Sequence, residues 1–404
     1  MVAANRELIR AINQFNILNA IRTMGTVSRV EIAEITGQSR ASVTNITAKL
    51  IQEGLIYEQK TEDTSLRGRK RVLLALNPDA AFAVGVKLSS SRISCAVTNM
   101  QADIISSISM PVRVGKRPVK FVADLIEEGV RHCVDDAKLK LSEISGIGLG
   151  IPGFVNSSKG VCYWTPLYRK GDATLHDLVF QRLKINTYIE NDANCVTMAH
   201  QWFGEGRGRD NFLVITIEDG LGMGIVMNGQ LYRGARGIAA EFGHVVVEPN
   251  GIRCRCGKKG CIEAYVSDFS ILNAAKEAMD EGIWHFAGNT DLTIYDVTRA
   301  AQDGEQCLMD VFSRAGSMLG LGLSGLIQIF NPSRIIISGD GVRAGSLMFD
   351  TMNRTFRMYA NPDLYDSTEI IIHKWKDTDW ARGAASLVLQ EVYKHPFSNL
   401  KNVL

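Results

Sequence analysis

Three of the chain's eight cysteines fall between residues 254 and 261, in the stretch CRCGKKGC, so any fold must place three thiols close together. With one upstream histidine they make up four candidate metal ligands: His244, Cys254, Cys256 and Cys261. Three thiolates and one imidazole favour zinc, and Gly257 and Gly260 permit the tight turns that the cysteines need. The basic residues of the stretch would make a poor apolar core. Since the protein itself fills all four positions, we expect a structural zinc rather than packed thiols.

The first 77 residues have the pattern of a winged helix-turn-helix domain. Apolar residues recur at helical spacing from Leu8 to Ile21, including Ile9 and Ile12, and the pattern stops at Gly25. The stretch SRVEIAEITGQSRASVTNITAKLIQEGLI then predicts a helix capped by Ser28, a turn at Gly37 and a second helix over residues 39–53. Two strand-like runs around a polar, arginine-bearing loop follow and predict a winged hairpin.

The second helix of this pair and the hairpin loop carry the residue types that contact DNA. The helix leaves a polar side for the major groove: Arg40, Ser42, Thr44, Asn45 and Lys49. In the loop, Arg67, Gly68 and Arg69 suit a narrow minor groove, because glycine lets the backbone approach closely. Residues 1–76 carry a net charge of +4 and the remainder −2, which agrees with a nucleic-acid contact. The alternative is a small protein-interaction domain with a solvated run of charges.

From Pro78 onward, strand-like and helix-like segments alternate, which is typical of an α/β domain with mainly parallel sheets. About 320 residues suffice for two lobes. We expect a first lobe over residues 78–191, completed by a C-terminal helix over 382–404, and a second lobe over 192–381.

The N-terminal stretch MVAANRELIRAINQFN lacks the apolar core of a signal peptide, and no apolar run approaches the roughly eighteen residues of a membrane span. We therefore expect a cytoplasmic protein without a membrane partner. Thiols stay reduced in that compartment, which favours metal binding over disulfides for the cysteine cluster. The five other cysteines occur singly and are expected to pack in the core.

Two motifs in fixed order, EFGH at residues 241–244 and CRCGKKGCIE at 254–263, resemble those of the ROK family, whose members are sugar kinases and sugar-responsive repressors. The likeness covers essentially the whole chain, and the N-terminal domain is similar to that of the repressor branch. The resemblance implies a two-lobed, actin-like ATPase (ribonuclease H-like) fold, operator DNA as partner, and homodimers that could pair into tetramers. It also implies a monosaccharide ligand held by Asn191, Asp192, Glu241, His244 and Glu263.

The kinase branch of the family carries a motif of the form DxGGT near its first strand pair. The matching stretch here, VGVKLSSSRIS, has Lys87 at the acidic position and Ser89 and Ser90 in place of glycines. Phosphoryl transfer needs backbone amides and glycines around the phosphates, so we expect a kept sugar site and a damaged nucleotide site. The favoured interpretation is a non-enzymatic repressor of carbohydrate genes that a monosaccharide releases from DNA. The alternative is a sugar kinase or a bifunctional regulator-kinase.

The chemical form of the sugar stays open at this point. A phosphate beside Asp192 would be repelled, which favours a neutral sugar. Arg169 and Lys170, close to Thr165 in the stretch YWTPLYRKGD, would instead attract a phosphate.

Overall fold

The computed structural model describes residues 6–60, 72–112, 114–115, 117–169, 174–288, 291–374 and 377–394. The chain divides into two compact units, the first comprising Met1–Gly208 with Asp377–Leu404 and the second Arg209–Lys376. The division falls later than residue 191, because helix α6 (Asp192–Phe203) packs on α13 (Asp377–Lys394) within the first unit. Among the described residues, no helix has the length and apolar character that a membrane crossing requires.

The first unit begins with a winged helix-turn-helix head. Its elements are α1 (Arg6–Met24), β1 (Thr26–Ser28), α2 (Arg29–Thr36), α3 (Arg40–Gln52), β2 (Ile56–Lys60) and β3 (Val72–Leu76), with sheet order β1-β3-β2. The Ser28 side chain accepts from the Glu31 amide while the Glu31 carboxylate accepts from the Ser28 amide, a complete capping box. Gly37 ends α2 at a φ of 66°, which confirms the predicted turn.

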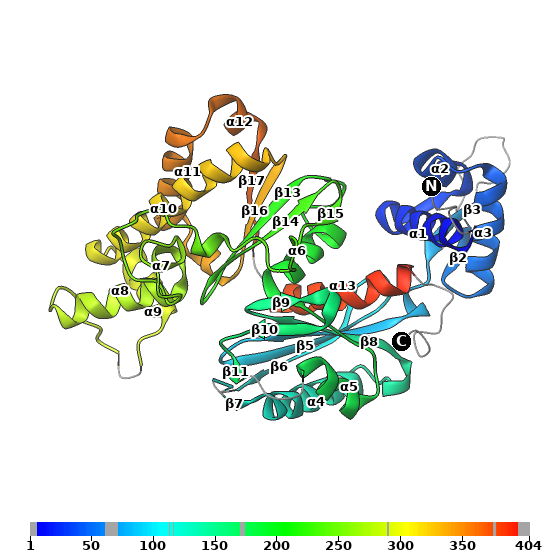
Figure 1. Cartoon of the computed structure of the whole chain (residues 1–404), viewed down its shortest axis with the longest axis horizontal. Helices are drawn as coiled ribbons and strands as arrows, with labels where there is room; N and C mark the ends of the chain where they lie inside the picture. The colour runs from blue at the N-terminus through cyan, green and yellow to red at the C-terminus, as the bar shows by residue number, and fades with distance from the viewer. Residues whose placement is uncertain are drawn as a thin grey trace. The chain divides into compact units, whose positions relative to one another are not determined.

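The rest of the first unit is a five-stranded sheet between two layers of helices. Its strands are β4 (Phe82–Leu88), β5 (Arg92–Thr98), β6 (Ile104–Pro111), β8 (Ile144–Ile151) and β12 (Thr187–Asn191), in the order β12-β8-β4-β5-β6. Helix α13 covers one face, while α4 (Val119–Asp136) and α5 (Leu175–Leu183) cover the other (Figure 1). Four short strands complete the unit: β7 (Arg117–Pro118), β9 (Phe154–Asn156), β10 (Val161–Trp164) and β11 (Tyr168–Arg169).

Helix α13 lies unusually close to this sheet because two glycines face it. Gly85 of β4 and Gly148 of β8 are register partners, and a Cβ on either would fall within 1.8 Å of a carbonyl oxygen of α13. Any larger side chain at these positions would therefore displace the helix. The close fit ties residues near the end of the chain to the first strands of the lobe.

The second unit also holds a five-stranded sheet, in the order β15-β14-β13-β16-β17. The strands are β13 (Phe212–Ile217), β14 (Leu221–Met227), β15 (Gln230–Leu231), β16 (Arg334–Ser338) and β17 (Glu369–Ile372). The helices are α7 (Glu263–Val266), α8 (Asp268–Asp280), α9 (Ile294–Gln302), α10 (Gln306–Phe330), α11 (Ser346–Tyr359) and α12 (Pro362–Ser367).

Both sheets are mixed, so the prediction of mainly parallel sheets is wrong. In the first sheet β12, β8 and β4 run parallel, whereas β4, β5 and β6 pair antiparallel. The connections between β4, β5 and β6 are only a few residues long, and such short turns join antiparallel neighbours. The second sheet repeats the arrangement, with parallel β13-β16-β17 and antiparallel β13-β14-β15.

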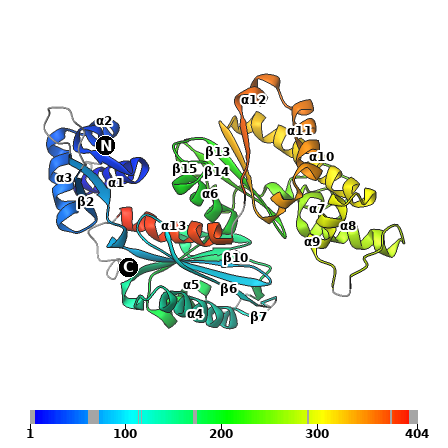
Figure 2. The same cartoon turned by 180° about the vertical axis from the view of Figure 1, so that it is seen from behind.

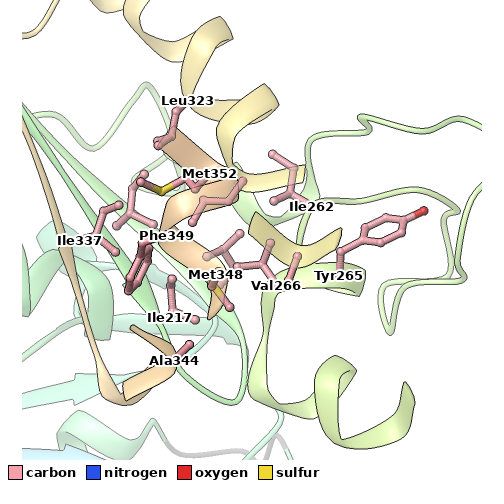
Figure 3. Packing of buried hydrophobic residues seen from close by; sticks show 14 of the residues in the cluster. Ile217, Ile262, Tyr265, Val266, Leu323, Ile337, Ala344, Met348, Phe349 and Met352 are labelled. Carbon is pink, nitrogen blue, oxygen red and sulfur yellow. The ribbon is translucent and has the colours of Figure 1, made fainter. Parts of the chain in front are cut away.

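The cysteine-rich stretch leads directly into the core of the second unit. Figure 3 shows Ile262 and Val266, which follow the last cysteine, packed among buried residues that include Met348 and Met352 of α11. The hydroxyl of Tyr265 points away from this cluster (Figure 3) and contacts Glu248 and the Ile252 amide. The loop is thus anchored at its C-terminal end by apolar packing and along its length by a tyrosine.

Candidate functional site

The four predicted metal ligands come together in the second unit. The donor atoms of His244, Cys254, Cys256 and Cys261 all lie within 4.8 Å of one another. Two of the separations, Cys256 Sγ to Cys261 Sγ and Cys254 Sγ to His244 Nδ1, are 3.7 Å. Zinc–sulfur bonds of about 2.3 Å at tetrahedral angles place two sulfurs about 3.8 Å apart. The cluster therefore has the size and the donor set for one tetrahedral ion such as zinc.

Local backbone geometry explains how three cysteines within eight residues converge. The Gly257 amide donates to the Cys254 carbonyl at 2.9 Å, and the Cys254 amide donates to the Lys258 carbonyl at 2.8 Å, which closes a tight turn. Gly257 and Gly260 have φ angles of 92° and 74°, in the region that favours glycine. At Gly260 a Cβ would also lie 1.6 Å from the Glu248 carbonyl oxygen. The predicted role of the two glycines is confirmed.

The thiols of the cluster differ in the direction in which their pKa values are shifted. Burial raises the pKa of Cys254 to about 12 and also raises the pKa of Cys261. At the exposed Cys256 burial acts in the same direction, but hydrogen bonds from the Lys258 amide and the neighbouring thiols outweigh it and lower the pKa. A zinc ion binds thiolates, so binding at this cluster must release protons from Cys254 and Cys261.

The predicted sugar-contact residues of the second unit surround this cluster. Glu263 opens α7, and its Oε1 lies 3.7 Å from Cys254 Sγ, while its Oε2 accepts from the Leu221 amide at 3.2 Å. Arg255 Nε lies 3.7 Å from the same carboxylate. The exposed Glu241 precedes a single 3₁₀ turn, Phe242–His244, and its carbonyl accepts from the His244 amide at 3.0 Å. His244 therefore connects Glu241 to the cluster, and Cys254 connects the cluster to Glu263.

The predicted sugar-contact residues of the first unit lie where β12 ends and α6 begins. Asn191 caps the helix, because its Oδ1 accepts from the Asn194 amide at 3.2 Å. Its Nδ2 donates to the Gly153 carbonyl at 3.1 Å, so the amide also ties down a neighbouring loop. Asp192 is the half-buried first residue of α6, where the helix dipole favours a carboxylate. The carboxyl ends of the parallel strands β8 and β12 meet at this edge, a common place for ligands in α/β sheets.

Glu190 directly precedes the predicted sugar contacts Asn191 and Asp192, and the sequence alone indicated no role for it. Its side chain is fully buried, and its Oε1 accepts from the Asn191 amide at 2.8 Å and from Asn194 Nδ2 at 3.0 Å. Glu190 thus organises the joint from which Asn191 and Asp192 project. The available indication was a carboxylate within a strand-like segment, TYIEN, since a charge that becomes buried there requires such donors.

The stretch VGVKLSSSRIS, which departs from the kinase motif, and the SGDG turn at residues 338–341 both make side-chain contacts within the chain. Lys87 Nζ lies 4.2 Å from the centre of the Trp380 ring, a cation–π contact at the end of β4. The Ser89 hydroxyl accepts from the Arg92 amide at 3.0 Å and closes the β4–β5 turn. In the second unit, Asp340 of the SGDG turn accepts from the Tyr295 hydroxyl at 2.7 Å and pairs with Arg343 at 3.1 Å.

Helix α3 presents the polar side that its sequence predicted. Val43, Ile46 and Leu50 are buried in the head. Arg40, Thr44 and Asn45 are exposed, while Ser42 and Lys49 are half-buried. Lys49 pairs with Glu53 at 3.6 Å, and the Ser42 hydroxyl donates to Gln38 at 3.4 Å. The flanking strands β2 and β3 form the predicted hairpin, but its loop residues Arg67, Gly68 and Arg69 lie outside the described residues.

A winged helix-turn-helix head and two α/β units with a His/Cys cluster define a DNA-binding transcriptional regulator on a two-lobed, actin-like fold. Residues 83–391 match the model of the ROK family, and the chain belongs to that family. Residues 10–65 match the model of the MarR family, which covers most of the head.

Several curated relatives span nearly the whole chain. The xylose repressor of Caldicellulosiruptor bescii is 28% identical over 403 residues, which cover 97% of this chain and 99% of the relative. The xylose repressor of Bacillus subtilis is 23% identical over 389 residues, covering 96% and 98%. The transcriptional dual regulator NagC of Escherichia coli is 26% identical over 356 residues, covering 88% and 87%.

Two solved structures match different shares of the chain, one with the head and one of a length that corresponds to the lobes. A ROK family transcriptional regulator, a homologue of the E. coli MLC protein, superimposes with a TM-score of 0.81 and 26% identity over 96% of this chain and 97% of its own. A ROK family glucokinase from Streptomyces griseus, in complex with glucose and AMPPNP, gives a TM-score of 0.66 and 26% identity over 76% of this chain and 99% of its own. The regulator's match extends over the head, whereas the whole glucokinase is matched by about three quarters of this chain.

Proposed function

We propose that this protein represses carbohydrate uptake or catabolism genes, that it binds operator DNA as a homodimer, and that a monosaccharide releases it. The observation that carries the proposal is the MarR-like head with its exposed polar helix, present in a chain that is similar over its full length to sugar-gene repressors. Such a regulator acts in the cytoplasm, where the DNA is.

Operator recognition is assigned to helix α3 and the wing. The exposed Arg40, Thr44 and Asn45, with Ser42 and Lys49 at their side, suit base edges and phosphates of the major groove. Arg67, Gly68 and Arg69 would enter the minor groove. Two heads of a homodimer would read half-sites about one helical turn, about 34 Å, apart, and two dimers could pair into a tetramer on longer sites.

The inducer is assigned to the two groups of polar residues described above. The residues assigned to contact it are those of the family resemblance: Asn191, Asp192, Glu241, His244 and Glu263. Sugar hydroxyls are dense donors and acceptors, and their burial requires partners such as carboxylates and an amide. A neutral monosaccharide fits these residues best, because three of the five are carboxylates that would repel a phosphate. The first candidates are xylose and N-acetylglucosamine, after which related repressors are named, and glucose, which is bound in the structure of the related glucokinase.

The metal is assigned as zinc, held by His244, Cys254, Cys256 and Cys261. Its role is structural, since four protein ligands leave no open coordination position. Bound there, the ion supplies positive charge that keeps the three thiols deprotonated. Within the chain, Cys254 contacts both His244 and Glu263, so that an ordered cluster holds these two side chains in fixed positions.

The proposal excludes phosphoryl transfer as the main function. The support is Lys87, which stands at the acidic position of the kinase motif and packs on Trp380, together with a serine-closed turn where glycines would cradle phosphates. The fold similarity to a glucokinase is the reason to keep a bifunctional regulator-kinase as the competing function.

One experiment separates the two functions. A DNA duplex is selected from a random library by the full-length protein, and its affinity is measured by fluorescence anisotropy with and without xylose, glucose, N-acetylglucosamine and their phosphate esters. We expect one neutral sugar to weaken DNA binding by about tenfold or more. ATP consumption is assayed with the same sugars. Sugar-dependent ATP turnover without any effect of the sugar on DNA binding would refute the repressor function and support the kinase function.

A further inference from the structure

The DNA-binding head of the first unit is not joined to its lobe by the backbone alone. Ile17, Leu18 and Ile21 of α1 belong to the same buried cluster as Leu389, Val392 and Tyr393 of α13 and Trp202 of α6. Figure 2 shows α1 beside the C-terminal end of α13. The head is therefore packed on α6 and α13 as well as linked to the lobe by the backbone.

Arg22, in the last turn of α1, makes the most specific contact across this core. Its Nη1 donates to the Trp202 carbonyl at 2.6 Å, and its guanidinium lies 4.3 Å from the centre of the Trp202 ring. Nε and Nη2 both donate to Asn19 Oδ1, at 3.2 and 2.8 Å, which fixes the plane of the group. Burial lowers the pKa of Arg22 to about 10, so it stays charged at neutral pH.

The Trp202 carbonyl is a position where a cation is favoured. It lies in the last turn of α6, where carbonyls lack partners within the helix and the helix dipole is negative. A second arginine reinforces the joint from α6's side, because Arg207 donates to the Thr23 carbonyl and, at 3.1 Å, to that of Arg22. The C-terminal end of α1 is thus held near the C-terminal end of α6 by two arginines, Arg22 in α1 and Arg207 four residues after α6.

The opposite end of α6 carries the proposed sugar contacts. Asn191 caps the helix and Asp192 is its first residue. Twelve residues span about 18 Å, and all of Ala193–His200 is buried, so the helix transmits a displacement of one end to the other.

We propose that Arg22 is the positioning residue that couples sugar binding at the start of α6 to the placement of the DNA-binding head. The inference rests on the proposed function, since it requires a sugar at Asn191 and Asp192. A ligand shifts operator affinity only through contacts that differ between two arrangements. The contacts of Arg22 with Trp202, here called the Arg22 clamp, make the head follow α6. A shift of that helix on sugar binding therefore changes the position in which the head is presented to the operator.

The test compares Arg22→Gln with Arg10→Gln in the full chain. Arg10 is exposed on the same helix, so both variants lose one charge on α1 but only the first loses the clamp. The readout is the ratio of operator dissociation constants with and without the sugar that releases the wild type. Sugar affinity by calorimetry and the melting temperature are measured in parallel.

We expect Arg22→Gln to reduce the wild-type ratio of about tenfold to about twofold or less, with sugar affinity unchanged. Arg10→Gln keeps the wild-type ratio, and Arg22→Lys restores part of it, since a lysine still donates to the Trp202 carbonyl. A full wild-type ratio in Arg22→Gln overturns the proposal. A wild type that no sugar releases instead refutes the proposed function.

Should Arg22→Gln fail to fold, the same measurement is made on Arg207→Gln, a substitution at an exposed residue. It removes the second tie without disturbing the core. A reduced ratio with unchanged sugar affinity supports the coupling, and an unchanged ratio overturns it.

Discussion

The proposed sugar contacts come from two regions that are built in opposite ways. Asn191 and Asp192 stand at the joint between β12 and α6, where side-chain hydrogen bonds with Glu190, Asn194 and the Gly153 carbonyl fix Asn191. Glu241, His244 and Glu263 lie on or beside an irregular loop whose shape depends on four His and Cys side chains meeting. The first region is held by the polypeptide alone, whereas the second would be held by the proposed zinc. Loss of the metal should therefore affect one half of the sugar contacts and spare the other.

Cys256→Ser should have the largest effect. Structural zinc contributes folding free energy directly, about 10–16 kcal/mol in isolated zinc-finger peptides, and this loop should lose its fixed shape without it. We expect the zinc content, measured by elemental analysis, to fall from one per chain to near zero and the sugar response to disappear, while DNA binding in the absence of sugar persists. Cys307→Ser, outside the cluster, is the control. One zinc per chain in Cys256→Ser would contradict the assignment of the ligands.

Asp192→Asn and Glu241→Gln test the two regions one residue at a time. Each substitution keeps the shape and removes a charged acceptor, so each should bind operator normally yet respond at least about tenfold less to sugar. Asp177→Asn and Glu281→Gln, exposed carboxylates of the same units, serve as matched controls. If either site variant is released at the wild-type sugar concentration, its residue does not contact the inducer.

Operator binding by the head should not depend on the sugar-contact residues, but it should depend on the exposed polar residues of α3. Asn45→Ala removes an exposed amide suited to an adenine edge, and we expect it to cost about 1–3 kcal/mol at one base position. Affinities for a set of single-base operator variants measure this. An equal loss on every sequence would assign Asn45 to the phosphate backbone instead.

Asn191→Ala probes the hydrogen-bonded region alone. Loss of the α6 cap should destabilise the first unit by about 0.5–2 kcal/mol in urea unfolding. The loss should be the same with and without zinc, because the Asn191 cap and the metal cluster belong to different compact units. Asn361→Ala, which removes a comparable cap from α12, should leave sugar affinity unchanged. A zinc-dependent effect of Asn191→Ala would show that the two regions are not independent.

The smallest effect is expected in the wing. Arg69→Ala should weaken operator binding modestly and lower the slope of log affinity against log salt by about one ion. An anisotropy series across salt concentrations measures the slope. Unchanged affinity and slope would remove Arg69 from the interface.

Local patterns predicted the head and the metal ligands because their determinants are close in sequence. Ser28, Gly37 and the ExGH and CxC spacings each act within a few residues. Contacts between distant segments were not predictable: α6 joins the first unit because it packs on α13, and Arg22 meets Trp202 across 180 residues. The apolar helical pattern also included Ile9 and Ile12, but these side chains are 46% and 50% exposed. They are exposed because the core of the head forms around the C-terminal half of α1.

Operator affinity with and without sugar, measured by anisotropy on the wild type and on Asp192→Asn side by side, tests the central claim most directly. The account predicts that a saturating neutral monosaccharide weakens wild-type binding by about tenfold or more and leaves Asp192→Asn bound. Equal operator affinity of the wild type with and without every sugar tested would contradict it.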